Sequence, residues 1–314
     1  MSFVLSLFAI AATLGSFAAA DPACQNTLAI YNPNIRSTCI NATWFVLPVT
    51  TSSVQALVPY PLLLPPYSDQ TLFPHGFPPT AHPVLLSSGY QNDIRMANLQ
   101  IPSLKQASIY IPYTDRLKDG KTAFNYPLLN YIGGTDGGSS QSDISFLQAI
   151  VPTLVGTAEG TNLLIAQITP GNDAYAALTS SPTELSTSVK QIVLPNPVSG
   201  PAVEPEVFDL DFITARSSSS LYTPHTFHAL INQPEILTNG ACQRNTYYFN
   251  ETFSAPVLRS GNATVYGPLA GAAPSQLAGV YTKAGGYSAS GQMVGYNAEA
   301  CDVAAASADP KAYQ

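Results

Sequence analysis

The sequence predicts a mainly β (α+β) fold with a few short helices, and the first reason is the distribution of its prolines. Eight prolines fall between positions 59 and 83 of the 314 residues. Proline breaks the helical hydrogen-bond ladder, so this stretch excludes a long helix. Six runs combine β-branched or aromatic residues with turn residues at their ends, which is typical of strands. These runs are residues 44–49, 84–88, 107–112, 161–168, 189–194 and 207–213.

Helices are expected to be short. Ala, Leu and Gln cluster without a proline at residues 52–58, 144–151 and 173–178, which favours helix there. Residues 133–143 are rich in Gly, Ser and Asp, so we expect an exposed loop. No internal repeat is found. Residues 21–314 are therefore expected to form one domain that ends in a Gly/Ala/Ser-rich tail.

The composition excludes several classes of protein. Hydrophobic residues make up 46% of the chain and charged residues only 10%. The net charge is −7 and the sequence pI is about 4.9, so the chain does not attract phosphate backbones or anionic lipid. A coiled coil and a nucleic-acid binder are excluded. The expected partner is a small-molecule ligand or substrate.

The N-terminus indicates secretion. Residues 1–20 are apolar and end in three alanines before Asp21, which is typical of a signal peptide cleaved after Ala20. No Lys or Arg precedes the apolar centre, so an uncleaved anchor is the alternative. No later segment is long and apolar enough to span a bilayer. Asn41, Asn250 and Asn262 stand in Asn-x-Ser/Thr sequons, and glycans there would supply surface polarity.

The four cysteines, Cys24, Cys39, Cys242 and Cys301, are an even count in a chain expected to meet an oxidising compartment. Two disulfides are expected, and three pairings are possible. We favour Cys24–Cys39 with Cys242–Cys301, because each then holds a terminal region within its own half of the chain. A zinc site is the poorer interpretation, because the sequence has no CxxC and no cysteine–histidine pair with ligand spacing.

Common catalytic signatures are missing from the sequence: there is no GxSxG, GxGxxG, Walker loop or HExxH. His225 and His228 have metal-ligand spacing, but no acid is nearby, so a surface or hydrogen-bonding role is expected. Asp209 and Asp211 share one face of a strand whose alternation favours a solvated face. The charged residues 115–121 are expected to form a solvated turn. We predict neither a metal nor a cofactor.

Three segments resemble segments of the acetoacetate decarboxylase family, and they follow one another along the chain in the same order as in that family. Residues 120–129, Gly-Lys-Thr-Ala-Phe-Asn-Tyr-Pro-Leu-Leu, resemble the family's Gly-Arg-Glu…aromatic-Pro-Lys-Lys segment. Residues 153–157 and 163–169 resemble its Leu-Val-Gly-Thr strand pair, and residues 45–62 its first strand, short helix and turn. The resemblance covers about residues 43–215. It implies a divergent secreted member, of fungal type, with a curved antiparallel sheet closed into a barrel or cone.

The resemblance also implies a pocket chemistry. The barrel would surround a buried apolar pocket, for which Phe124, Tyr126 and Pro127 are the candidate lining residues. In the family a lysine, activated by desolvation and a neighbouring cation, forms an imine with a β-keto acid. The positions that match the family's lysine pair hold Leu128 and Leu129 here.

The rest of the family's catalytic set is also unmatched. No glutamate precedes Glu159, and no arginine lies between Arg36 and Arg95. Lys105, just before the strand 107–112, is the best substitute nucleophile in the sequence, but the favoured expectation for it is an exposed surface position.

Three functions follow as hypotheses. The first is a decarboxylase-like enzyme that acts on a small β-keto acid or a polyketide-derived carbonyl compound. The second is a secreted binding protein for a small apolar ligand, which suits leucines at the positions of the lysine pair. The third is a secreted structural or surface protein. With an apolar pocket floor, we expect no imine adduct and a preference for neutral ligands over acids.

Overall fold

The computed structural model describes residues 24–64, 70–135, 143–171, 173–193, 203–216, 220–249, 254–269 and 271–313. The expected signal segment and the sequon at Asn250 lie outside these residues. No helix among those that the structure describes is both long and apolar enough to cross a membrane.

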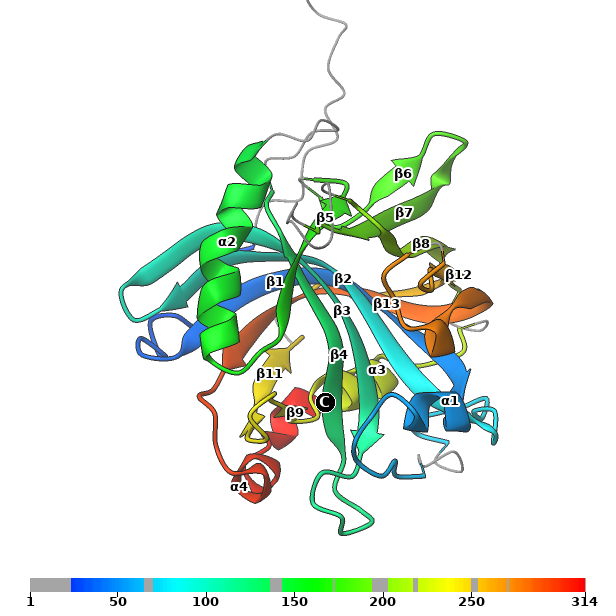
Figure 1. Cartoon of the computed structure of the whole chain (residues 1–314), viewed down its shortest axis with the longest axis horizontal. Coiled ribbons are helices and arrows are strands. Elements are labelled where there is room, and N and C mark those ends of the chain that lie inside the picture. The colour runs from blue at the N-terminus through cyan, green and yellow to red at the C-terminus, as the bar shows by residue number, and fades with distance from the viewer. Residues whose placement is uncertain are drawn as a thin grey trace, which may run out of the picture.

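Nine strands form a closed ring in the order β4, β3, β2, β1, β13, β12, β8, β7, β5 (Figure 1). Neighbouring strands are antiparallel except at one place: Asn130–Ile132 of β4 pair in parallel with Leu163–Ile165 of β5 and close the ring. The strands of the ring are β1 (Arg36–Thr50), β2 (Ala81–Met96), β3 (Leu99–Thr114), β4 (Phe124–Gly133), β5 (Leu163–Thr169), β7 (Ser181–Gln191), β8 (Glu206–Thr214), β12 (Val257–Val265) and β13 (Gly279–Gly295). The fold is therefore a mixed β-barrel, which confirms the predicted mainly β class.

Short strands and helices lie around this ring. The short strands are β6 (Ala176–Leu178), β9 (Glu235–Ile236), β10 (Cys242–Gln243) and β11 (Asn245–Tyr248). The helices are α1 (Thr51–Gln55), α2 (Asp143–Ala158), α3 (Pro224–Ile231) and α4 (Cys301–Ala306), with 3-10 turns at Ser275–Leu277 and Pro310–Tyr313. Helix α2 connects β4 to the parallel strand β5 and packs along the outside of both (Figure 1). Such a crossover is what parallel neighbours require.

The four runs expected to share one sheet, residues 44–49, 107–112, 161–168 and 207–213, lie on β1, β3, β5 and β8 of the ring. The helix expected at residues 173–178 is wrong. Ala176 and Ala177 instead pair with Ser186 and Leu185 of β7, because the neighbouring strand supplies hydrogen bonds that outweigh the helix propensity of alanine.

The interior of the barrel is filled by alternate residues of its strands, because successive side chains point to opposite faces. On β3 these are Ala107, Ile109 and Ile111, all completely buried. On β1, Phe45 lies directly opposite Gly286 of the neighbouring strand β13, where a Cβ atom would come within 2.6 Å of the Phe45 ring. Glycine at that position therefore leaves the space that the phenylalanine occupies.

A second, aromatic core lies on the outer face of the barrel, beneath α3 and β11. Trp44 of β1 contacts Phe249 edge-on, with ring centroids 5.6 Å apart. Phe227 of α3 stacks on Tyr287 of β13 at 5.3 Å. His228 stacks on Phe249 at 4.8 Å and its Nε2 lies 3.1 Å from the Tyr287 hydroxyl. The α3 layer is thus held to the barrel by aromatic packing.

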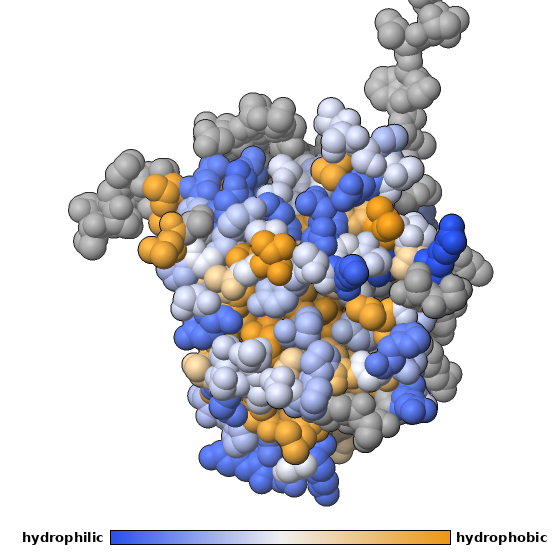
Figure 2. Space-filling model, turned by 90° about the vertical axis from the view of Figure 1, so that its right-hand side faces the viewer, coloured by the Kyte–Doolittle hydropathy of each residue, from blue (hydrophilic) through white to orange (hydrophobic). Residues whose placement is uncertain are grey.

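Both disulfides are present, and they join Cys24 to Cys39 and Cys242 to Cys301. This is the pairing that the sequence favours. On the face shown in Figure 2, apolar side chains are interspersed with weakly and strongly hydrophilic ones. Asn262 is exposed, whereas Asn41 is half-buried on β1.

We expect acid to destabilise the barrel through His82. This residue is completely buried, and burial lowers its pKa to about 4 although Nε2 is hydrogen-bonded to the carbonyl of Pro112. The unfolded chain binds a proton below pH 6.5, whereas the folded chain does so only near pH 4. The free energy of unfolding should therefore fall by about 3 kcal/mol as the pH drops from 6.5 to 4. Urea unfolding across this range measures the loss, and His82→Gln should flatten it; an equally steep loss in that variant would exclude His82 as the cause.

Candidate functional site

The most unusual side chain inside the barrel is Lys105. It lies two residues before Ala107 on β3 and shares the interior face with it, opposite Tyr90 of β2 and Gly133 of β4. Its side chain is completely buried, and its Nζ lies 5.3 Å from the centre of the Tyr90 ring. Among the described residues, Nζ has no hydrogen-bond partner. The exposed position expected for Lys105 is therefore wrong.

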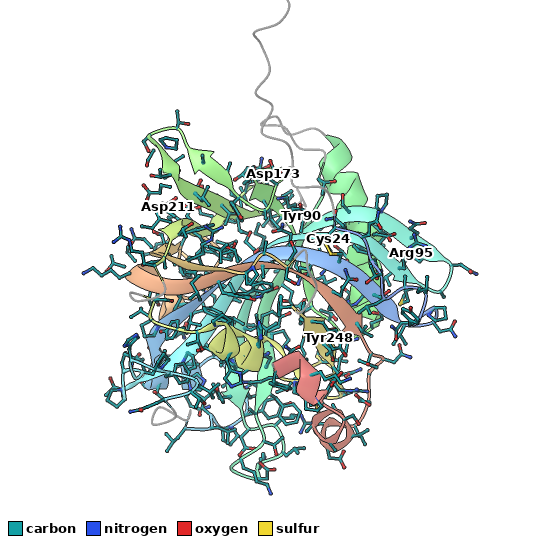
Figure 3. The ribbon with its side chains drawn as sticks, turned by 180° about the vertical axis from the view of Figure 1, so that it is seen from behind. Cys24, Tyr90, Arg95, Asp173, Asp211 and Tyr248 are labelled. Atoms are coloured by element: carbon teal, nitrogen blue, oxygen red, sulfur yellow. A yellow bond between two sulfur atoms is a disulfide. The ribbon has the colours of Figure 1, made fainter. Side chains whose placement is uncertain are left out.

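Burial changes the protonation of Lys105. Desolvation lowers the pKa of the Lys105 amine to about 7, and the charge of Asp173 opposes this shift only in part. Figure 3 shows Tyr90 and Asp173 at the same end of the barrel. At neutral pH about half of the amine is uncharged, and the shift costs the fold about 4 kcal/mol. A lysine kept at this cost is a candidate for chemistry rather than for stability.

Arg259 of β12 is a second buried cation on the interior face. Its Nε donates to Ser288 Oγ (2.8 Å), its Nη1 to Thr214 Oγ1 (2.8 Å) and its Nη2 to the Tyr175 hydroxyl (3.1 Å). Desolvation lowers the pKa of Arg259, and all three acceptors are neutral. Guanidinium carries five N–H groups, so two remain for another acceptor.

Besides Lys105 and Arg259, the interior face of the barrel also carries neutral polar groups. Ser88 Oγ lies 3.0 Å from Thr187 Oγ1, which in turn donates to the carbonyl of Thr169. The hydroxyl of Tyr131 is buried with no partner among the described residues, and burial raises the pKa of Tyr131. One end of the interior is therefore polar, while the other end is hydrocarbon.

No buried carboxylate on the described ring strands balances the two cations, and the charge of Asp173, which lies off the ring, acts on Lys105 only in part. In the described part of the chain, the buried acids are Asp115 and Glu235. Asp115 follows β3 and accepts from the backbone amides of Asp119 and Gly120, and Glu235 lies on β9 outside the ring. Buried cations are normally paired, so the interior is suited to an anionic ligand.

The residues that the resemblance singles out lie elsewhere in the barrel. Leu128 and Leu129 are half-buried on β4 and pack against the interior core. Leu129 lies opposite Ile109, four residues from Lys105 along β3, which is about 13 Å. The structure therefore does not place Lys105 at the leucine pair.

The candidate lining residues of the pocket also lie away from Lys105. Phe124 is completely buried, but in a separate small cluster with Ile236 and the Cys242–Cys301 disulfide. Tyr126 borders both that cluster and the barrel core, and its ring contacts Tyr60 at 6.4 Å. Pro127 lies opposite Tyr110 on β3. A pocket floor formed by this segment remains a prediction.

The other motifs serve the fold. His225 is exposed, with Nδ1 2.8 Å from the carbonyl of Tyr313, and His228 is buried among aromatic rings. Asp209 accepts a hydrogen bond from the Tyr266 hydroxyl at 2.6 Å on the outer face of β8. No group of three or more His, Cys, Asp or Glu side chains within the described ranges is arranged to hold a metal ion.

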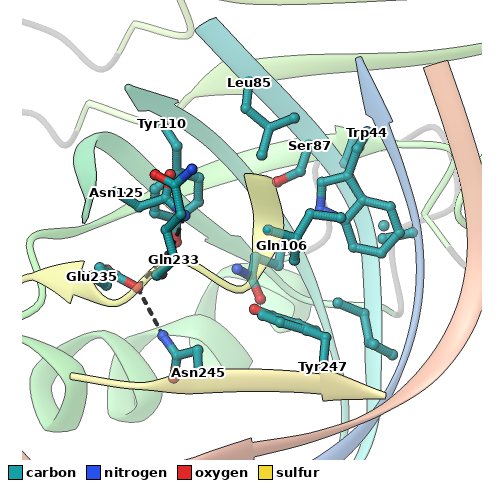
Figure 4. Close-up of a pocket in the computed structure, with 15 residues that line it drawn as sticks. Trp44, Leu85, Ser87, Gln106, Tyr110, Asn125, Gln233, Glu235, Asn245 and Tyr247 are labelled. Carbon is teal, nitrogen blue, oxygen red and sulfur yellow. Dashed lines mark hydrogen bonds between the residues drawn. The ribbon is translucent and has the colours of Figure 1, made fainter. Parts of the chain in front are cut away.

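A small cavity of about 30 Å³ lies on the outer face of β1–β3, beneath β9 and β11 (Figure 4). Glu235 Oε2 accepts from Asn245 Nδ2 (2.7 Å), and Asn245 Oδ1 accepts from Arg36 Nη2 (2.7 Å). Burial raises the pKa of Glu235, and the nearby Arg36 opposes this. The cavity has room for about two water molecules and is lined by no lysine. The buried Lys105 amine inside the barrel is therefore the better candidate for chemistry.

Sequence reasoning missed Arg259 and misjudged Lys105 for the same reason. Neither residue belongs to a recognisable sequence motif. Each is buried only because the ring of strands closes, and a local sequence pattern does not show this closure. One signal was available for Lys105: its spacing from Ala107, Ile109 and Ile111 follows the period of the strand. No comparable signal marked residues 257–265 as a strand.

Replacing Lys105 should stabilise the fold. Lys105→Met keeps the length of the side chain and removes the desolvated amine, so we expect the free energy of unfolding at pH 7 to rise by about 2–4 kcal/mol. Chemical denaturation measures this change. Lys283→Met is the matched control at an exposed position, where a change within about 0.5 kcal/mol is expected. A destabilised Lys105→Met variant would show that the amine has a structural role.

The chain was compared with known families, curated proteins and solved structures. No family model and no curated protein matches it. The enduracididine biosynthesis enzyme MppR, complexed with the condensation product of pyruvate and imidazole 4-carboxaldehyde, is 14% identical with a TM-score of 0.46, over 85% of this chain and 90% of that chain. An acetoacetate decarboxylase-like enzyme from Sphingomonas wittichii RW1 is 10% identical with a TM-score of 0.43, over 85% and 93%. Both likenesses are too distant to transfer a site or a reaction to this chain.

Proposed function

We propose that the barrel binds a small oxo acid, a β-keto acid or a polyketide-derived acid, and forms an imine between its carbonyl carbon and Lys105. The observation that carries this proposal is the buried Lys105 amine, which has no hydrogen-bond partner among the described residues and a pKa of about 7. An uncharged amine in a dry environment is the nucleophile that imine formation requires.

The chemistry follows from the amine. Uncharged Nζ adds to the carbonyl carbon, and loss of water gives the imine, which is protonated on nitrogen. When the bound acid is a β-keto acid, its carbon–carbon bond to the carboxylate breaks, carbon dioxide leaves, and the electron pair moves to the iminium nitrogen to give an enamine. A proton then adds to the carbon, and water releases the ketone and regenerates the Lys105 amine.

Arg259 supports an acidic substrate. Its three hydrogen-bond acceptors are neutral, and two N–H groups remain available to the oxygens of a carboxylate. This arrangement argues against the apolar pocket and the preference for neutral ligands that the leucine pair predicts.

Secretion is also part of the proposal, because two disulfides suit an oxidising compartment. Asn262 is the exposed sequon.

A second candidate function is capture of a carbonyl compound without turnover. It is favoured by the lack of a buried carboxyl group on the ring strands that the structure describes, because proton transfer to carbon needs an acid. Both candidates share the imine on Lys105. Release of carbon dioxide separates them.

Reductive trapping tests the imine. We expect borohydride to fix one adduct of acetoacetate or pyruvate per chain, located on Lys105 by peptide mass spectrometry. Lys105→Met should lose the adduct, and Lys283→Met should keep it. Adducts spread over several lysines, or none at all, would contradict the proposal.

The rate of adduct formation should report the lowered pKa of Lys105. The amine reacts only when uncharged, so the initial rate should rise about tenfold per pH unit below pH 7 and level off above it. Trapping at a series of pH values between 5 and 10 measures this profile. A rate that keeps rising to pH 10, as for an ordinary lysine, would place the reactive amine in water.

Loss of Arg259 should weaken binding of acids selectively. Arg259→Gln keeps hydrogen-bonding capacity and removes the charge, so we expect a 10- to 100-fold loss (roughly 1.5–3 kcal/mol) for an oxo acid. A neutral ketone of the same size should bind the variant and the wild type about equally. Equal losses for acid and ketone would mean that Arg259 only supports the fold.

A further inference from the structure

A segment outside the sheet covers the end of the barrel that contains Lys105. On the interior face, Lys105 lies opposite Tyr90, Tyr90 opposite Asn41, and Asn41 opposite Ser290. Two residues nearer the end of the barrel, the next interior row contains Asn92 of β2, Cys39 of β1 and Gln292 of β13. Residues 24–27, called here the N-terminal strap, attach to this row.

The strap is tied to the row by one covalent bond and by polar contacts. Cys24 forms the disulfide with Cys39. Gln292 Oε1 accepts from the backbone N–H of Thr27 (2.9 Å), and Gln292 Nε2 donates to the carbonyl of Gln25 (2.7 Å). The strap therefore lies over the ends of β1, β2 and β13, one interior row beyond the row of Lys105, and Figure 3 shows Cys24 close to Tyr90.

Hydrogen bonds alone hold the strap weakly. Asn26 Nδ2 donates to Ser37 Oγ (3.0 Å) and to the carbonyl of Asp93 (2.9 Å), and no strap residue belongs to a hydrophobic core cluster. Segments that bury little apolar surface open locally at low free energy. The disulfide is thus the strong attachment. Since Lys105 is completely buried, a compound can reach it only when part of its cover moves.

We propose that the N-terminal strap is a gate over Lys105, tethered shut by the Cys24–Cys39 disulfide. Cys24 is the partly exposed partner of this bond, whereas both cysteines of Cys242–Cys301 are buried. A dithiol reductant therefore attacks the strap disulfide first. It supplies two electrons and two protons, is itself oxidised to a disulfide, and leaves Cys24 and Cys39 as thiols. The gate concerns access alone; only the compound it admits rests on the proposed function.

The test measures access to the Lys105 amine without any substrate. Formaldehyde with cyanoborohydride methylates accessible amines, and peptide mass spectrometry follows the rate at each lysine. We compare the wild-type protein, Cys24→Ser/Cys39→Ser, and the control Cys242→Ser/Cys301→Ser. The strap variant should label Lys105 at least about tenfold faster, whereas the control should match the wild type, because local opening sets the rate at a buried group.

If the strap variant fails to fold, a second measurement tests the gate in the wild-type protein. Wild-type protein is treated with a mild dithiol until mass spectrometry shows two thiols at Cys24 and Cys39 and an intact second disulfide, and labelling is then repeated. Unchanged labelling of Lys105 in the reduced protein overturns the gate. Faster labelling without an acetoacetate adduct supports the gate and contradicts the proposed function. An adduct that forms equally fast in tethered and reduced protein supports the function and overturns the gate.

Discussion

The whole architecture depends on one short contact, the parallel pairing of three residues of β4 with three of β5. Every other contact in the ring is antiparallel and joins strands into an open sheet. Only this pairing closes the sheet, and α2 makes it possible by returning the chain to the same end of the barrel. Closure removes both sheet edges and separates an inner face from water.

The closed inner face gives Lys105 its properties. In an open sheet the amine would reach water, and its pKa would stay near that of an ordinary lysine. In the barrel it is desolvated, as is Arg259, and no buried carboxylate of the described ring strands compensates them. Stability and chemistry therefore oppose each other at this site, as is common at functional sites. The hydrocarbon half of the interior and the aromatic layer under α3 carry the stability instead.

Much of the fold follows from the sequence, whereas the site follows only in part. Short apolar runs between turn residues predict the strands of β1, β3, β5 and β8, because local alternation reflects a half-buried or buried face. Of the three possible disulfide pairings, the one that the cysteine positions favour is confirmed. The helix expected at residues 173–178 fails, because pairing with β7 is a tertiary effect that local composition does not contain.

The site depends on which face of a strand is enclosed, and the sequence does not state this. Lys105 alternates in step with the apolar residues after it, and that period was the available signal. Arg259 becomes a buried interior cation only because β12 lies between β8 and β13 with Arg259 on its inner face. The strap joins residues 24–27 to Gln292, more than 260 positions away, a contact that no local pattern predicts.

The central claim is that the barrel holds an amine with a pKa near 7, about half of it uncharged at neutral pH. Titration of protein labelled with ¹⁵N-lysine, followed by NMR of the side-chain nitrogens, tests this claim without substrate or activity. We expect one resonance with a midpoint near pH 7, and its absence from Lys105→Met assigns it. A wild-type protein in which no lysine titrates below about pH 9 would contradict the account.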